Sequence, residues 1–216
     1  MTDFGFTRYG FAAVILAAGE STRMGRDKAL LALPGSQDTM LSANIKRLMP
    51  FTQIVIVVAG ANASTLQPLV FAQGAFMAEN PDPSRGQFSS LHVGLQEVLN
   101  RGRDVAVITH VDRLPPRPDT MQALLNRFQH VAVLPDTERK WAVVPETMDP
   151  ATGIARHGHP ILAGRELIEA FLKAPFTMSA REVEHSHQSR IDYLAVEDAN
   201  VIADLNTPEE YTARGG

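Results

Sequence analysis

An apolar run over residues 12–18 opens directly into a glycine-bounded loop, and this junction restricts the fold more than any other stretch of the chain. The run Ala-Ala-Val-Ile-Leu-Ala-Ala is typical of a β-strand that is buried on both faces. Gly19 and Gly25 bound the loop, and it is accompanied by the cations Arg23, Arg26 and Lys28. Glycine lets backbone N–H groups approach an anion closely, and cations neutralise it. The junction therefore predicts a phosphate site, with a spacing that is neither a P-loop nor G-x-G-x-x-G.

The length and charge of the chain exclude several classes of protein. We expect 216 residues to form one domain over residues 1–216, with residues 1–11 as an N-terminal extension. A net charge of −4 gives no basic field for nucleic acid or an anionic membrane surface. No stretch approaches the ~20 apolar residues of a membrane helix, and no basic signal-peptide region precedes the first strand. The absence of cysteine excludes thiolate metal sites and a cysteine nucleophile, and it agrees with a cytoplasmic location.

Helical and strand-like segments alternate along the chain. The predicted strands after the first one are 53–59, 75–78, 105–109, 131–134, 141–145 and 191–196, and the predicted helices are 39–49, 62–71, 91–99, 118–128, 164–172 and 179–185. Residues 150–158 have the composition of a loop, and Thr207-Pro208 predicts the start of a final helix. The alternation predicts an α/β fold, Rossmann-like and doubly wound, with a mostly parallel sheet and helices on both faces. Because ligands bind beyond the carboxyl ends of parallel strands, we expect the loops after Ala18, Ala59, Ala78 and Thr109 to meet at one edge.

The loop from Asn80 to Leu91 is a second candidate anion site. Gly86 lies in this loop, and either Ser89 or Ser90 can cap the helix that follows. A capped helix N-terminus also binds anions, because its N–H groups are free and its dipole is positive there. The alternative is a plain turn and helix cap.

Two later segments place polar residues after predicted strands. Asp112 follows the strand 105–109, where a carboxylate is well placed to hold Mg²⁺ together with substrate phosphates and water. The next residue, Arg113, is a candidate contact for a phosphate or for a second substrate. His157 and His159 are two residues apart, but no third ligand with zinc-site spacing lies nearby in the sequence, which disfavours a metal pair.

Residues 16–28 read L-A-A-G-E-S-T-R-M-G-R-D-K, and they resemble the signature L-A-A-G-x-S-x-R-M-G-x-x-K of the MobA-like nucleotidyltransferases. They are most similar to the molybdenum cofactor cytidylyltransferase branch, because the guanylyltransferase branch tends to carry Leu-Ala-Gly-Gly. The resemblance implies a nucleotide-diphospho-sugar transferase-like fold. It also implies nucleotide binding by Leu16, Ala17, Ala18, Gly19, Ser21 and Gly25, and catalysis by Arg23 and Lys28.

Four further segments resemble the family in the same order. Gly86 and Ser89-Ser90 match a second nucleotide-binding loop, Gly-Met-Ser-Ser-Ser-Leu, from which Gln87-Phe88 depart. Val111-Asp112 matches Val-Asp-His-Pro and implies a catalytic metal ligand, whereas Arg113-Leu114 depart from it. Gly158-His159-Pro160 matches an acceptor-binding segment, Gly-His-Pro-Val-Leu, and we place Arg113, His159 and Pro160 on the acceptor side. Asp204 matches the first aspartate of a closing Asp-Ile-Asp-Thr-Pro segment and implies a second metal ligand, with Asn206 in place of the next aspartate.

The resemblance implies an Mg²⁺-dependent transfer of CMP from CTP to the molybdopterin cofactor, with release of pyrophosphate. A molybdoenzyme or a chaperone is a possible docking partner. Two alternatives stay open at this point. The acceptor can be another phosphorylated compound, such as a sugar or alcohol phosphate or a different pterin, or the nucleotide can be GTP. The chain can also be a nucleotide- or cofactor-binding protein without catalytic activity.

Overall fold

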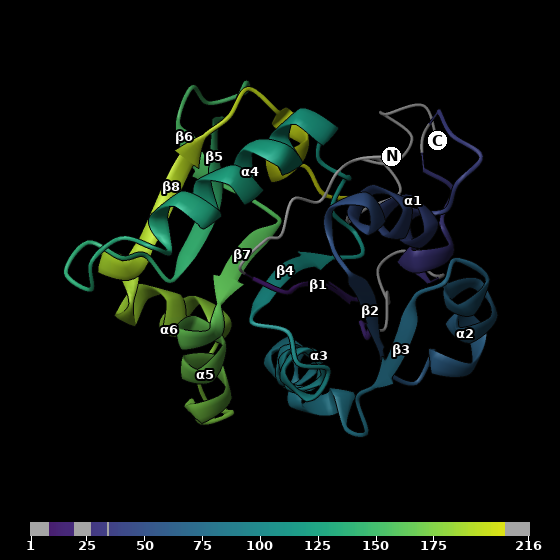
Figure 1. The fold of residues 1–216 in the computed structure, drawn as a ribbon. Coiled ribbons are helices and arrows are strands. Elements are labelled where there is room, and N and C mark those ends of the chain that lie inside the picture. Colours follow the sequence, from purple (N-terminus) through teal and green to yellow (C-terminus); the bar gives the residue numbers. More distant parts are fainter. Residues whose placement is uncertain (1–8, 20–26, 34, 206–216) are drawn as a thin grey trace.

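A computed structural model describes residues 9–19, 27–33 and 35–205 of the chain (Figure 1). Ser21, Arg23 and Gly25, for which we predict nucleotide binding and catalysis, lie outside the described residues, as does the predicted helix at Thr207.

One mixed sheet forms the centre of the molecule. Its strands follow the order β3-β2-β1-β4-β7-β5-β6, and β8 pairs with β5. Their bounds are β1 Phe11–Leu16, β2 Ile54–Ala59, β3 Phe76–Glu79, β4 Val105–His110, β5 Ala142–Met148, β6 Ala155–His157, β7 Ile161–Gly164 and β8 Ile191–Ala195. The first four strands are parallel, β7 is antiparallel to both β4 and β5, and β8 is parallel to β5. The predicted α/β class, with its mostly parallel sheet, is confirmed.

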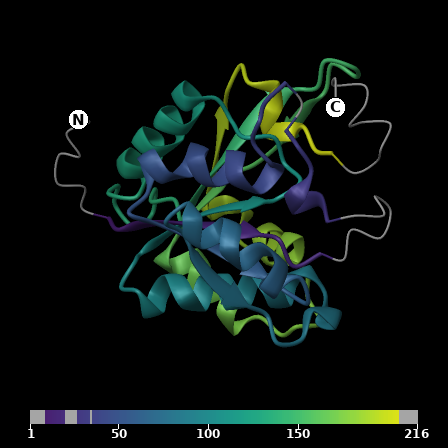
Figure 2. The same ribbon diagram turned by 90° about the vertical axis from the view of Figure 1, so that its right-hand side faces the viewer.

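Helices cover both faces of this sheet (Figures 1 and 2). The helices α1 Met40–Leu48, α2 Ala63–Ala72 and α4 Pro118–Val131 pack on one face, and α3 Gln87–Asn100, α5 Arg165–Lys173 and α6 Ala180–Ser186 pack on the other. Alternate residues of β1 enter the two cores, Ala13 and Ile15 on the first face and Ala12 and Val14 on the second. This double burial explains why the strand is an unbroken apolar run without a polar face.

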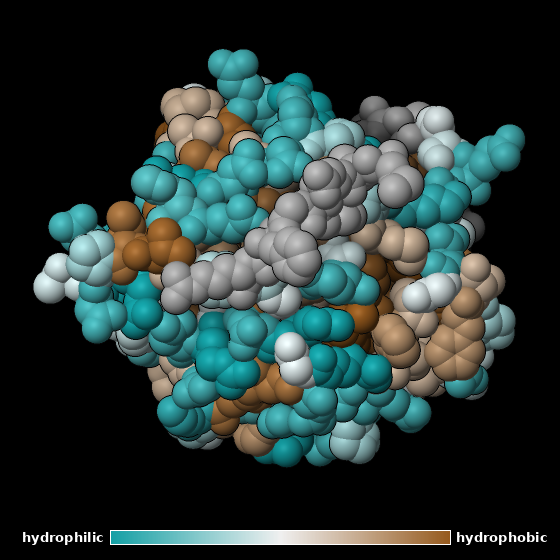
Figure 3. Space-filling model, viewed as in Figure 1, coloured by the Kyte–Doolittle hydropathy of each residue, from teal (hydrophilic) through white to brown (hydrophobic). Residues whose placement is uncertain are grey.

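Short 3-10 helices complete the described part: η2 Lys28–Leu30, η3 Met49–Phe51, η4 Pro83–Arg85, η5 Gln188–Arg190 and η6 Ala199–Ile202. Within this part no helix is long and apolar enough to cross a membrane. The face drawn in Figure 3 is mainly hydrophilic, with its hydrophobic residues in separate patches.

Three sequence predictions for the secondary structure are wrong. The strand predicted over 131–134 does not form, because Phe128 and Val131 continue the buried stripe of α4 and the helix runs through Val131. The loop predicted over 150–158 contains β6, which forms a hairpin with β5. The helix predicted over 91–99 begins at Gln87, and its N-cap is Gly86 with a φ of 84°, so neither Ser89 nor Ser90 caps it. In addition, β7 was not predicted. It has only four residues, it directly follows His159-Pro160, and it does not alternate apolar with polar residues.

Candidate active site

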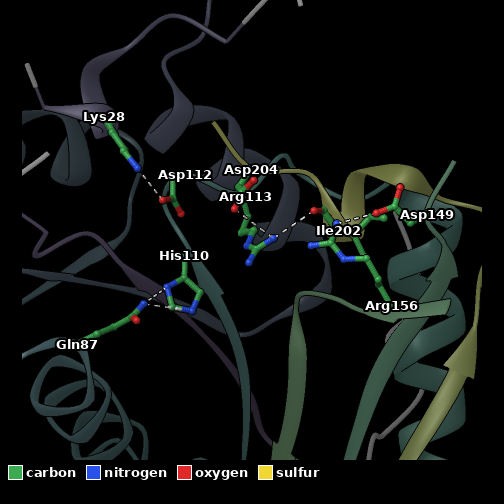
Figure 4. A network of polar contacts seen from close by, with 9 residues as sticks. All are labelled: Lys28, Gln87, His110, Asp112, Arg113, Asp149, Arg156, Ile202 and Asp204. Atoms are coloured by element: carbon green, nitrogen blue, oxygen red, sulfur yellow. Dashed lines mark hydrogen bonds and ion pairs between the residues drawn. The ribbon is translucent and has the colours of Figure 1, made fainter. Parts of the chain in front are cut away.

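The carboxyl ends of β1 and β4 lie side by side and bring the first two candidate segments together. Leu16 is paired with His110 at the ends of these strands, as expected for parallel strands that leave the sheet at the same edge. Lys28 Nζ lies 3.0 Å from Asp112 Oδ2, and both side chains are largely buried, with 14% and 25% exposed (Figure 4). The two predicted catalytic groups therefore form an ion pair directly beyond the sheet.

Local structure holds each member of this pair. Lys28 is the first residue of η2, whose N-cap is Asp27, and Asp27 Oδ1 accepts a hydrogen bond from the Ala29 amide at 2.9 Å. On the other side, the carbonyl of Asp112 accepts a bond from the Leu205 amide at 2.9 Å. The segment after β4 is thereby joined to the last described residues of the chain.

The contact between the segment after β4 and the last described residues also brings Arg113 and Asp204 together. They form an isolated antiparallel bridge, Arg113 Nη1 lies 3.7 Å from Asp204 Oδ2, and it also donates to the Ile202 carbonyl at 3.3 Å (Figure 4). Arg113 therefore neutralises the carboxylate that the sequence predicts as the second metal ligand. The segment is anchored further back by Asp198, which accepts bonds from the Arg117 amide and the Thr120 hydroxyl at 2.7 and 2.8 Å.

The second loop is organised by a residue that the sequence analysis did not select. Asn80 Nδ2 donates to the hydroxyls of both Ser89 and Ser90, at 2.8 and 2.9 Å, and all three residues are buried. Ser89 Oγ also donates to the Gly86 carbonyl at 2.7 Å. In this structure the two buried serines hold the loop in shape, and the exposed residues of the loop all precede them, Gly86 and Gln87 among them. The position of Asn80 directly after β3 was the available signal.

His110 is the other residue that the sequence analysis missed, although it stands beside Asp112 in the same motif. Its ring packs edge-on against that of His159, with 4.7 Å between centroids, and it contacts the amide of Gln87 (Figure 4). Burial lowers the pKa of His110, with Asp112 opposing this effect and Arg113 adding to it. Burial also holds the pKa of His159 well below its usual value, together with the charges of His110 and Arg113. Both rings are therefore neutral near pH 7, and His159 is not suited to act as a charged acid.

A cavity of about 1130 Å³ opens beside these histidines. Its lining includes the predicted site residues Leu16, Gly86, Arg113 and His159 together with Gln87 and His110. It therefore continues the candidate site from the ends of β1 and β4 toward β7, β5 and α6. A second cavity, of 720 Å³, lies beside α1, and its lining contains none of the predicted site residues that the structure describes.

The far wall of this cavity carries aromatic and charged side chains from β6, β8 and α6. His157 stacks on Tyr193 with 3.9 Å between ring centroids and 14° between planes, and His157 Nε2 lies 3.1 Å from Glu146 Oε2. Arg156 lines the same wall and donates to Asp149 Oδ2 at 2.9 Å. Burial raises the pKa of Glu184, on α6, to about 7, and Arg181 partly opposes the rise.

Asp112 and Asp204 have the donor chemistry of a magnesium site completed by a substrate. Magnesium is usually held by one or two carboxylates, and phosphate oxygens and water fill its remaining positions. Among the described residues no group of three or more histidine, cysteine, aspartate or glutamate side chains forms a metal site. The two carboxylates thus suit a cation whose remaining positions are filled by a polyphosphate and water.

Comparison with known families identifies the relatives of this fold and site. The model of the MobA-like NTP transferase domain matches residues 13–191. The chain belongs to this family. The match includes both Lys28 and Asp112, and it extends through the cavity wall to the start of β8.

Curated relatives agree with the family. A protein of Rhodopirellula baltica named "Probable molybdenum cofactor guanylyltransferase" is 26% identical over 205 residues, which is 92% of each chain. A protein of Mycobacterium ulcerans with the same name is 35% identical over 103 residues, 47% of this chain and 48% of that protein. The latter match therefore spans about half the length of that relative.

Solved structures agree with the fold. The crystal structure of Rv0371c from Mycobacterium tuberculosis H37Rv has a TM-score of 0.76 at 24% identity, covering 96% of this chain and 97% of that one. Rv0371c in complex with manganese has a TM-score of 0.71 at 23% identity, covering 95% and 98%. These structures show that the fold of this chain is shared with Rv0371c over nearly the whole length of both proteins.

Proposed function

We propose that this nucleotidyltransferase moves CMP from CTP to the terminal phosphate of molybdopterin, releases pyrophosphate and uses Mg²⁺. The observation that carries the proposal is the pairing of Lys28 with Asp112 at the shared edge of β1 and β4, next to the Arg113–Asp204 pair and a cavity of about 1130 Å³. A cation and two carboxylates at this edge suit a nucleoside triphosphate with its metal. The cavity has room for a bulky second substrate.

The reaction joins two polyanions, so charge neutralisation is the main task of the protein. An ionised phosphate oxygen of the acceptor attacks the α-phosphorus of CTP, and the bond from that phosphorus to the bridging oxygen breaks as pyrophosphate leaves. Because the acceptor oxygen carries no proton near neutral pH, neither a protein nucleophile nor a strong general base is required. Lys28 binds and neutralises phosphate oxygens, and Arg113 holds Asp204 in place. Asp112 and Asp204 would hold Mg²⁺, which would supply further neutralisation of the phosphates.

The choice of base has a second candidate. Ala18, in the Leu-Ala-Ala-Gly segment, favours CTP by resemblance, and in the structure it lies at the end of β1, partly buried. GTP is favoured by the curated relatives, which carry the name guanylyltransferase. Manganese in the complex of Rv0371c supports a divalent cation at this fold and leaves its identity to the test below.

A thermal-shift panel of CTP, GTP, ATP and UTP, each with and without Mg²⁺, tests the nucleotide. A ligand at 100 times its Kd stabilises the folded state by about 2.7 kcal/mol. For a chain of this size, that stabilisation raises Tm by roughly 5–11 °C. A rise with CTP that Mg²⁺ strengthens supports the proposal, and a rise with GTP in its place moves the activity to guanylyl transfer.

Pyrophosphate release with a panel of acceptors tests the second substrate. Release with molybdopterin but not with sugar phosphates, alcohol phosphates or other pterins supports the proposal. Tight nucleotide binding with no release from any acceptor would instead identify a binding protein without catalysis.

A further inference from the structure

We propose that Asn62 is a positioning residue for nucleotide binding: it ties the end of β1 to Asp27 and thereby sets the place of Lys28. This inference rests on the proposed function only in taking Lys28 as a phosphate ligand. The loop after β2, which contains Asn62, was expected at the active edge of the sheet but was assigned no role from the sequence.

The carboxamide of Asn62 uses both ends. Its Nδ2 donates to the Ala17 carbonyl at 2.9 Å and to Asp27 Oδ2 at 2.7 Å, and its Oδ1 accepts from the Gly60 amide at 3.0 Å. Neither an aspartate nor an alanine can reproduce this set, because the first has no donor and the second has no polar group. The bond to a carboxylate is of the stronger, charge-assisted kind.

The position of Asn62 predicts a different use for its side chain. Asn62 is the N-cap of α2, and asparagine at an N-cap normally accepts a bond from the backbone N–H groups of its own helix. Here the side chain makes no such cap bond. It points to Ala17 and Asp27 instead, so the needs of α2 do not explain why this residue is asparagine.

Asp27 links Asn62 to the short helix that begins at Lys28. One carboxylate oxygen of Asp27 accepts from Asn62 and the other caps η2, in which Lys28 is the first residue. Lys28 Nζ then lies 3.0 Å from Asp112. A continuous series of bonds therefore connects the end of β1, through Asn62 and Asp27, to the cation that we place on the phosphates.

The turn between β2 and α2, which contains Gly60 and Asn62, has little freedom to shift. A Cβ atom on Gly60 would lie 3.1 Å from the Ala18 carbonyl oxygen and 3.2 Å from the side chain of Pro83. Gly60 is thus packed between the end of β1 and the second nucleotide loop. Because a displacement of about 1 Å at a catalytic group can cost about 100-fold in rate, a fixed turn is a suitable support for Lys28.

The test compares Asn62→Asp with Asn62→Ala and with the surface control Asn126→Ala. The exposed side chain of Asn126 accepts a bond from Gln122 in the same helix. Asn62→Asp keeps the size of the side chain but places a carboxylate against Asp27. We expect the Kd of the preferred NTP to rise at least about tenfold in both Asn62 variants, because a charge-assisted bond is lost. We expect the acceptor KM to stay within twofold of that of the wild type, and Asn126→Ala to change neither constant.

The swapped variant Asn62→Asp with Asp27→Asn provides the rescue, because a donor at position 27 then faces an acceptor at position 62. We expect it to bind the NTP more tightly than Asn62→Asp alone. An NTP Kd within twofold of wild type in folded Asn62→Asp would overturn the inference, as would a swap without rescue, or unfolding of both Asn62 variants and the swap. If the wild-type protein binds no nucleotide, the proposed function fails; if it binds and the variants bind equally well, only the role of Asn62 fails.

Discussion

The parallel strands β3-β2-β1-β4 and the mixed strands β7, β5, β6 and β8 present different chemistry at the same edge of the sheet. Beyond β1 and β4 lies the largely buried ion pair of Lys28 and Asp112. Beyond β7, β5 and β8 lie neutral His159, the His157–Tyr193 stack and the wall of a large cavity. We infer that the first region neutralises phosphate charge. We infer that the second region, whose wall combines stacked rings with charged side chains such as Arg156 and Arg181, holds the second substrate, and the following changes test this division.

The largest effect is expected from Lys28→Ala. Loss of one preorganised charge contact in an active site costs about 3 kcal/mol, so turnover should fall by a hundredfold or more. At the same time Asp112 loses its cation, and Mn²⁺ should bind more tightly in the absence of nucleotide. Pyrophosphate release and calorimetry with Mn²⁺ measure the two effects. The control is Lys46→Ala, which removes an exposed lysine of α1 that pairs with Asp38 in the preceding turn. Unchanged turnover in Lys28→Ala would refute the site.

A smaller effect, on stability, is expected from Gly158→Ala. An added Cβ would lie 2.2 Å from the Val201 carbonyl oxygen, a backbone atom that cannot turn aside. In the parallel half, a Cβ on Gly94 would meet a side-chain atom of Val14 at 2.5 Å. Overpacking costs about 1–3 kcal/mol, and in α3 the helix preference of alanine offsets up to about 1 kcal/mol. Urea unfolding should show a larger loss for Gly158→Ala than for Gly94→Ala.

The same pair allows a rescue experiment. Val14→Ala should restore part of the stability lost in Gly94→Ala, because it removes the side chain that is struck. No change of the Val201 side chain should restore the stability lost in Gly158→Ala, because the added Cβ there clashes with the backbone carbonyl oxygen of Val201. If a side-chain change at Val201 restored Gly158→Ala as fully as Val14→Ala restores Gly94→Ala, the backbone of the mixed half would have to shift to make room for the added Cβ.

Arg156→Ala tests whether the cavity wall serves the second substrate alone. Arg156 is half exposed on the cavity wall, and loss of a charged hydrogen bond to a ligand there costs about tenfold in affinity. We expect the acceptor KM to rise by about this factor while the NTP Kd is unchanged. Arg165→Ala is the control, because Arg165 pairs with Asp104 outside the cavity. An equal rise of the NTP Kd would contradict the division of the site.

The smallest effect is expected from Glu184→Gln. Burial raises the pKa of Glu184 to about 7, so the folded state holds its proton at pH values where the unfolded state has lost it. Stability should therefore fall as pH rises from about 4.5 to 7, and the glutamine variant should lack this loss. Because water still reaches the side chain, we expect a gain of only about 1 kcal/mol at pH 8, or about 2–4 °C in Tm. Thermal unfolding at pH 5 and pH 8 measures it; a variant that is less stable at pH 8 would be contrary evidence.

Much of the parallel half, formed by β3, β2, β1 and β4, could be predicted from the sequence, because the patterns that specify it are local. The buried run of β1, the glycine-bounded loop and the aspartate after β4 each occupy a few consecutive residues, and parallel strands bring such loops to one edge. The loops that carry Lys28 and Asp112 were accordingly expected at one edge, and the two side chains lie 3.0 Å apart there. The mixed half was harder, because β6 and β7 are short and are stabilised by partners that are distant in the sequence.

The residues alone predicted the α/β class, a phosphate site at one edge of the sheet and the family resemblance, since strand burial and glycine-rich turns leave a direct pattern in the chain. Tertiary structure added the relations between separate segments: Arg113 against Asp204, Asn80 beneath Ser89 and Ser90, and Asn62 between Ala17 and Asp27. Asparagine in particular has no periodic signature. Whether its amide caps a helix or joins two loops depends on which groups the fold brings within about 3 Å of it.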